Sequence, residues 1–182
     1  MNIYLDTATE DFVLFLFNDK FEIIDKIILK GYRKKVELIT NEYYNILTRN
    51  NLQTVDLAAF YTNIGPGFFT GVRSSLVFFR AIAMVLNKKI FYCNTFAILE
   101  KQTNDEDLFL DAQGNKQYFY KRSSSSIANE KTIKVIDAAK QSHKIDFEQM
   151  AANFPSYKDI FQTDELLKIE PLYIKKPQIG GK

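Results

Sequence analysis

The chain of 182 residues carries 24 Lys and Arg against 22 Asp and Glu, and 46% of its residues are hydrophobic. This balance does not indicate a nucleic-acid-binding protein, and the apolar content suffices for a core without disulfide support. The single cysteine, Cys93, excludes an internal disulfide framework and a cysteine-rich metal site; its apolar surroundings predict a core residue. We find no stretch near the roughly 18 apolar residues of a membrane span and no secretory signal, so we expect a cytoplasmic protein.

The first half of the chain changes from strand to helix patterns. Three strands joined by short turns are predicted first, in residues 2–6, 12–18 and 21–29. Then follow an amphipathic helix over Lys34–Arg49, a buried strand over Val55–Asn63, a second helix over Phe68–Leu86 and a strand over residues 89–94. Thr95 is placed to cap a short helix that runs to Glu100.

The second half repeats the order of the first three strands. Leu108–Arg122 reads as a strand that ends in Asp111, a polar turn and a second strand, and Lys131–Asp137 supplies a third. Asp6 ends the first strand of the chain in the same way. Such a repeat predicts two lobes that face each other. From Asp146 onward we expect helical and irregular structure, then a last strand over Glu170–Lys176.

A glycine loop, Asn63–Arg73, lies between the predicted buried strand and the second helix. It is not a P-loop, because no lysine follows Gly71, and it is not a dinucleotide fingerprint, because Thr70 occupies the third glycine position. The glycines still let the backbone approach a neighbour closely at a helix N-terminus. That neighbour could equally be a phosphate or the other lobe.

Asp6 and Asp111 each end a first strand of the repeat, next to a turn. In a cleft, the two carboxylates could hold a metal or orient an attacking water. Each could instead cap its own turn through side-chain hydrogen bonds, and the residues alone favour this second interpretation.

Four motifs resemble the TsaB (YeaZ) family. They are Asp6–Thr9, the loop Gly65–Arg73, Asp111–Tyr118 and Pro171–Lys175. The resemblance implies an α/β fold of the ASKHA (actin/Hsp70-like) class, with two lobes of mixed sheets flanked by helices. The lobes would span residues 1–95 and 96–182, the second being shortened.

The resemblance also implies a function: a non-catalytic scaffold that pairs with its catalytic paralogue TsaD in threonylcarbamoyl-adenosine modification of tRNA. The TsaE ATPase would join a ternary complex, and tRNA would be contacted indirectly. No cofactor is expected, although a vestigial cleft could bind ATP or ADP weakly. Its residues would be Asp6, Thr7, Gly65, Pro66, Gly67 and Asp111. Phe68 and Gln113 stand where the family has serine and arginine, which argues against nucleotide contacts.

The residues give little support for an enzymatic function. TsaD holds a metal through paired histidines, whereas this chain has a single histidine, His143, which we expect to be a solvated loop residue. We therefore expect no metal site and no glycoprotease activity. The alternative function is an ATP-dependent phosphotransferase of the same fold that uses Asp6, Asp111 and the glycine loop.

Both long helices carry apolar residues beyond one stripe, so a second face of each needs a partner. The resemblance implies pairing through these helices, with the paralogue or with a second copy. The predicted partner-binding residues are Val36, Ile39, Tyr43, Leu47, Val72, Leu76, Phe78, Phe79 and Ala83. We predict a homodimer for the chain alone and a heterodimer with the paralogue, and we expect Tyr43 and Phe78 to be exposed.

Overall fold

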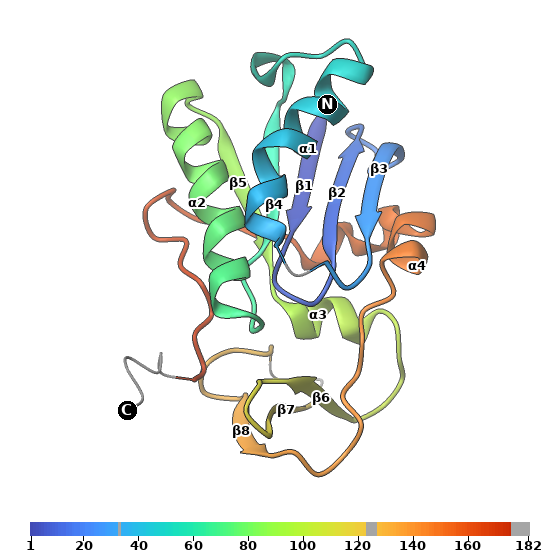
Figure 1. Cartoon of the computed structure of the whole chain (residues 1–182), viewed down its shortest axis with the longest axis vertical. Coiled ribbons are helices and arrows are strands. Elements are labelled where there is room, and N and C mark those ends of the chain that lie inside the picture. The colour runs from blue at the N-terminus through green and yellow to red at the C-terminus, as the bar shows by residue number, and fades with distance from the viewer. Residues whose placement is uncertain (33, 123–126, 176–182) are drawn as a thin grey trace.

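The computed structural model describes residues 1–32, 34–122 and 127–175, and it contains two β-sheets flanked by helices (Figure 1). The first part of the chain forms β1 (Asn2–Asp6), β2 (Phe12–Phe17), β3 (Ile23–Leu29), α1 (Lys35–Arg49), β4 (Ala59–Asn63), α2 (Phe69–Leu86), β5 (Lys89–Cys93) and α3 (Thr95–Glu100). The second part forms β6 (Asp107–Asp111), β7 (Lys116–Lys121), β8 (Lys134–Asp137), α4 (Phe147–Ala152) and β9 (Gln162–Thr163), with 3-10 turns at Thr54–Asp56 and Phe154–Ile160.

The larger sheet has the strand order β3-β2-β1-β4-β5-β9. Its first three strands are antiparallel, β4 and β5 lie parallel to β1, and β9 returns antiparallel to β5. The smaller sheet is the antiparallel meander β6-β7-β8. In Figure 1 the helices α1 and α2 lie over one face of the larger sheet, and the smaller sheet lies beyond its lower end. We call these two sheets with their helices the first and second lobes.

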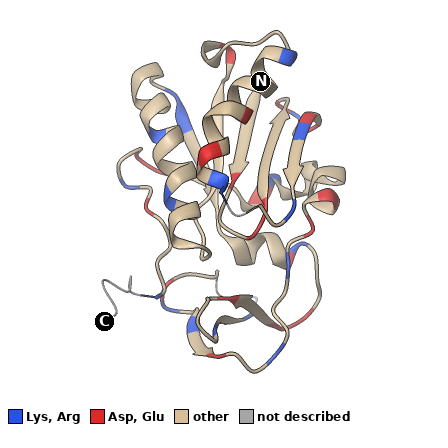
Figure 2. Ribbon diagram, in the orientation of Figure 1, with Lys and Arg blue, Asp and Glu red and all other residues tan. Residues whose placement is uncertain are grey.

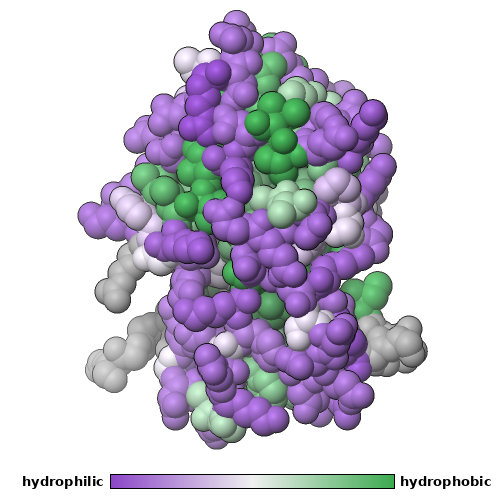
Figure 3. Space-filling model, turned by 90° about the vertical axis from the view of Figure 1, so that its right-hand side faces the viewer, coloured by the Kyte–Doolittle hydropathy of each residue, from purple (hydrophilic) through white to green (hydrophobic). Residues whose placement is uncertain are grey.

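The central strands are buried on both faces, which explains their almost continuous apolar sequences. Side chains alternate across a strand. Ile3 and Leu5 of β1 therefore pack in the cluster that α1 and α2 complete, whereas Tyr4 between them packs with Phe15 and Phe154 on the opposite face. β3 forms the edge of the sheet, and Figure 3, which views the molecule from that side, shows mainly hydrophilic residues.

Helix α2 is long and apolar enough to cross a membrane by length and composition alone, so the expectation that no stretch approaches such a span is wrong. The helix packs instead within the first lobe. Its row Leu76, Phe79 and Ala83 is buried in the same cluster as Phe60 of β4. Packing against the sheet thus accounts for one face of the helix.

Several predicted boundaries shift in the structure. The strand expected from Val55 begins only at Ala59, because residues 54–56 form a 3-10 turn. Asn94, and not Thr95, caps α3: its side-chain oxygen accepts a hydrogen bond from the backbone of Ala97 at 2.8 Å. The strand expected over Glu170–Lys176 is absent from its described part, residues 170–175.

The second lobe is short, as expected, because the repeat covers only its three-strand meander. After β8 the chain returns to the first lobe, where α4 contacts β3 and β9 joins the larger sheet. The lobe expected over residues 96–182 therefore does not coincide with the second sheet.

Candidate functional site

The glycine loop lies against the connection that follows β1. A Cβ atom on Gly67 would stand 2.1 Å from the carbonyl oxygen of Ala8, and one on Gly71 would stand 1.9 Å from that of Thr7. The Phe68 N–H donates to the Ala8 carbonyl at 2.7 Å, and the Thr7 hydroxyl donates to the Gly71 carbonyl at 2.6 Å. The close neighbour of Gly67 and Gly71 is therefore backbone of the same lobe, which neither alternative drawn from the sequence had included.

Thr95 fastens the other end of this loop. Its backbone N–H donates to the Gly65 carbonyl at 2.9 Å, and its hydroxyl donates to the Pro66 carbonyl at 2.7 Å. The Gly65 N–H donates to the Asn63 side chain at 2.8 Å, and Gly65 has a φ of +97°, a conformation that favours glycine. Asn63 and Thr95 thus shape the loop, and motif reasoning had given neither of them this role.

Asp6 is fully buried beneath the loop. The Tyr4 hydroxyl and the Asn63 amide donate to one carboxylate oxygen at 2.7 and 2.9 Å, and the Ala8 N–H donates to the other at 2.8 Å. Burial raises the pKa of the Asp6 carboxyl, and the three hydrogen bonds act against this rise. Burial also raises the pKa of the neighbouring Cys93 thiol, which is a core residue as predicted. Asp6 therefore organises the core and has no free oxygen facing a cleft.

Asp111 behaves differently. Its side chain is exposed, and one carboxylate oxygen accepts the Gln113 N–H at 2.8 Å, which is the turn-capping role that the residues favoured. It also lines a cleft of about 320 Å³ between the lobes, together with Pro66, Gly67 and Phe68. The structure thus brings Gly67, Pro66 and Asp111 to one cleft and leaves the Asp6 carboxylate out of it.

Charged residues missed by sequence reasoning surround this cleft. The Lys144 ammonium from the second lobe lies 2.6 Å from the Glu10 carboxylate of the first. Lys35 is buried nearby. Its ammonium donates to the Thr9 carbonyl and stands 4.8 Å from the centroid of the Phe68 ring. Burial lowers the pKa of Lys35, and the negative charges of nearby carboxylates oppose this shift.

His143 also lies at this cleft and is not the solvated residue expected. Its Nδ1 accepts the Phe109 N–H at 3.1 Å, and its Nε2 lies 3.0 Å from the Asp105 carboxylate. Its ring stacks on that of Phe109. Within the described residues, no three His, Cys, Asp or Glu side chains lie close enough together to hold a metal ion.

The predicted partner-binding residues fall into two groups. Seven of the nine are buried in the protein's own core: Ile39, Tyr43, Leu47, Val72, Leu76, Phe79 and Ala83. The expectation that Tyr43 is exposed is therefore wrong. They form the stripes that α1 and α2 turn toward the sheet and toward each other. Val36 is 47% exposed and Phe78 is half-buried, and both line a groove of about 500 Å³ between the two helices.

Two lobes, each opening with an antiparallel meander, and a glycine loop leading into a helix define a protein of the ASKHA class with a shortened second lobe. The chain belongs to the family described as TsaD, tRNA N6-adenosine threonylcarbamoyltransferase, which it matches over residues 29–173. Similarity to solved YeaZ structures confirms the resemblance to the TsaB (YeaZ) family.

The individual relatives are distant. The chain is 20% identical to the uncharacterized protein MG208 of Mycoplasma genitalium over an alignment of 190 residues. This alignment covers 96% of this chain and 95% of MG208. YeaZ from Pseudomonas aeruginosa is similar with a TM-score of 0.61 and 19% identity, over 80% of this chain and 71% of that one. An uncharacterized protein with similarity to peptidase YeaZ from Pseudomonas aeruginosa gives 0.68 and 16%, over 96% and 99% of the two chains. At such identities the structural likeness establishes the fold.

Proposed function

We propose that this chain is a non-catalytic subunit that pairs with a catalytic TsaD paralogue and supports threonylcarbamoyl-adenosine modification of tRNA. The observation that carries the proposal is that the place where a catalytic centre would lie, around Asp6 and the glycine loop, is filled by the protein's own contacts. The Asp6 carboxylate is fully buried with both oxygens hydrogen-bonded, and Gly67 and Gly71 pack on Ala8 and Thr7. A phosphoryl group or a metal would have to displace these contacts.

The same closure argues against the alternative, an ATP-dependent phosphotransferase. That chemistry requires donors and charges preorganised around the transferred group. Asp6 would first have to leave the core, and Asp111 is engaged in capping its own turn. Weak binding of ATP or ADP in the cleft between the lobes stays compatible with the proposal, because the cleft lies outside the Asp6 network.

The surface that supports pairing is the groove between α1 and α2. Val77 is 55% exposed on α2, and it lines this groove with Val36, Phe69 and Phe78. Fully burying such an apolar side chain stabilises an interface by about 1.5–3 kcal/mol, of which the costs of association cancel a part. An apolar groove between two parallel ridges suits a helix pair of similar shape, supplied by the paralogue or by a second copy of this chain.

The proposed assembly follows from one shared surface. Alone, the chain forms a homodimer; with the paralogue it forms a heterodimer that the TsaE ATPase joins, in the cytoplasm, and most tRNA contacts come from the paralogue.

Sedimentation velocity of the full chain, titrated with the paralogue, tests this assembly. We expect a dimer of the chain alone to be replaced by a one-to-one heterodimer as the paralogue is added, because the two partners compete for one groove. A homodimer that persists and binds the paralogue as a larger complex would show that the groove is not the shared surface.

A further inference from the structure

The C-terminal segment from Ile169 to Lys175 runs along α2 (Figure 1). The Leu172 N–H donates to the Ile64 carbonyl at 2.7 Å, and the Arg80 guanidinium donates to the Ile169 carbonyl. The segment is thereby held beside the glycine loop, near the start of the helix.

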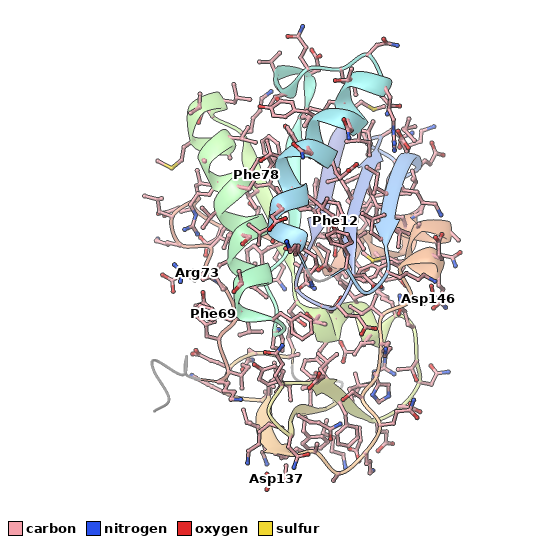
Figure 4. The ribbon with its side chains drawn as sticks, in the orientation of Figure 1. Phe12, Phe69, Arg73, Phe78, Asp137 and Asp146 are labelled. Carbon is pink, nitrogen blue, oxygen red and sulfur yellow. The ribbon has the colours of Figure 1, made fainter. Side chains whose placement is uncertain are left out.

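An aromatic and cationic column forms where this segment passes the first turn of α2. The Tyr173 ring stacks on the Phe69 ring, with centroids 5.1 Å apart and an interplanar angle of 30°. The Arg73 guanidinium stands 5.3 Å from the centroid of the same Phe69 ring. Phe69 and Tyr173 both remain 41% exposed; Phe69 also lines the α1–α2 groove, so Tyr173 supplies the ring area that stays available for a further planar group when that groove is filled. Figure 4 shows Phe69 and Arg73 next to each other on the lower half of α2.

The column borders a pocket of about 280 Å³ that reaches from the glycine loop to the second lobe. Phe68 and Tyr118 line it with Phe69 and Tyr173, and none of the described residues that line it is acidic. Lys175 also lines it, and its ammonium lies 3.5 and 3.4 Å from the carbonyl oxygens of Ala112 and Gln113, with no carboxylate partner in the described part of the chain.

The cations here are not neutralised by the protein. Within the described residues, neither Arg73 nor Lys175 forms an ion pair, whereas most basic groups at the cleft on the other side of Phe68 face carboxylates. Basic positions on α2 and at the end of the described chain lie on one side of the molecule (Figure 2). Glu170 acts electrostatically on Tyr173 but does not line the pocket.

We propose that this pocket binds a single-stranded segment of RNA. Aromatic faces stack on any base, and Arg and Lys neutralise the phosphates between them. Lys175 lies in the pocket, and Arg73 lies beyond Phe69, outside the pocket and on the border of the α1–α2 groove. Charges both inside and outside the pocket suit a polynucleotide that runs past it better than a single nucleotide. The inference rests on the proposed function, because tRNA would supply the segment.

Fluorescence anisotropy tests the proposal, with the full chain, alone and with the paralogue, and a labelled oligouridylate of about 12 nucleotides. Tyr173→Ala should weaken binding about fivefold or more, since stacking on one base is lost, whereas Tyr173→Phe should bind like the wild type. Affinity falls as salt rises, and Lys175→Ala should make the slope of log affinity against log salt less steep by about 0.7. Lys89→Ala, which removes an exposed lysine at the start of β5, just beyond the far end of α2, serves as the control and should change neither quantity.

Three outcomes overturn the proposal: no RNA binding by the wild type, unchanged binding by Tyr173→Ala and Lys175→Ala, or displacement of the oligonucleotide by ATP at equal affinity, which would indicate a free-nucleotide site. Tyr173 and Lys175 do not line the α1–α2 groove, so both variants should still pair with the paralogue in sedimentation. Loss of RNA binding with intact pairing supports this inference. Loss of pairing by the wild type would instead contradict the proposed function.

Discussion

Replacing Val77 by aspartate is expected to give a folded monomer that no longer pairs with the paralogue. Val77 is 55% exposed and lines the α1–α2 groove, so the substitution removes little from the core and stability should change by only about 0.5 kcal/mol. In the complex, however, the carboxylate would lose its water in a mainly apolar interface, and a pair with Arg73, one turn away on α2, would offset only part of that cost. We expect association to weaken by about 30-fold or more, equivalent to roughly 2 kcal/mol, measured by sedimentation or calorimetry.

Val85→Asp is the matched control, because it makes the same change on the same helix. Val85 is 83% exposed and lies outside the groove. The Val85→Asp variant should therefore dimerise and bind the paralogue like the wild type. If Val77→Asp still pairs normally, or if both variants fail equally, the interface does not lie in the groove.

Gly71→Ala is expected to destabilise the first lobe strongly. The new Cβ would stand 1.9 Å from the Thr7 carbonyl oxygen, and neither the helix start nor the β1 connection can move away without breaking the hydrogen bonds between them. We expect a loss of about 3 kcal/mol in the free energy of unfolding. For a chain of this size, that loss lowers the melting temperature by about 6–12 °C in a calorimetric scan.

Gly31→Ala separates this clash from an ordinary glycine effect. Gly31 has a φ of +63°, yet a Cβ there would meet nothing within 4 Å. The substitution Gly31→Ala should lower the free energy of unfolding by only about 1 kcal/mol, from backbone strain alone. A melting temperature for Gly71→Ala equal to that of Gly31→Ala would mean that the loop does not rest on Thr7 as described.

Local patterns predicted most of the elements, because apolar spacing and turn residues act over short stretches of chain. The apolar runs of β1 and β2 and the 3-4 spacing of α1 and α2 each correspond to an observed element. The failures lie where a distant segment decides the outcome. Nothing near Lys35 in sequence indicates that its ammonium donates to the Thr9 carbonyl, and nothing near His143 indicates that its ring stacks on Phe109.

The candidate site shows the same division. The motifs named Asp6 and the glycine loop as parts of one cleft, but the role of each depends on tertiary contacts. The partners of the Asp6 carboxylate include Asn63, 57 residues away, and the close approach at Gly71 is made to Thr7. Tyr43 is buried because α2 packs beside it, with the Phe78 ring 5.1 Å away, so helical spacing alone could not separate the core face from the free face.

Reconstituted tRNA modification, with the paralogue, TsaE, ATP and threonylcarbamoyl precursors, and with or without this chain, tests the central claim most directly. We expect modification to depend on the chain, and a chain carrying Asp111→Asn to support it within about twofold of the wild type, because a supporting subunit supplies no catalytic carboxylate. Val77→Asp should abolish this support. Full modification without the chain, or loss of turnover in Asp111→Asn with pairing intact, would contradict the account.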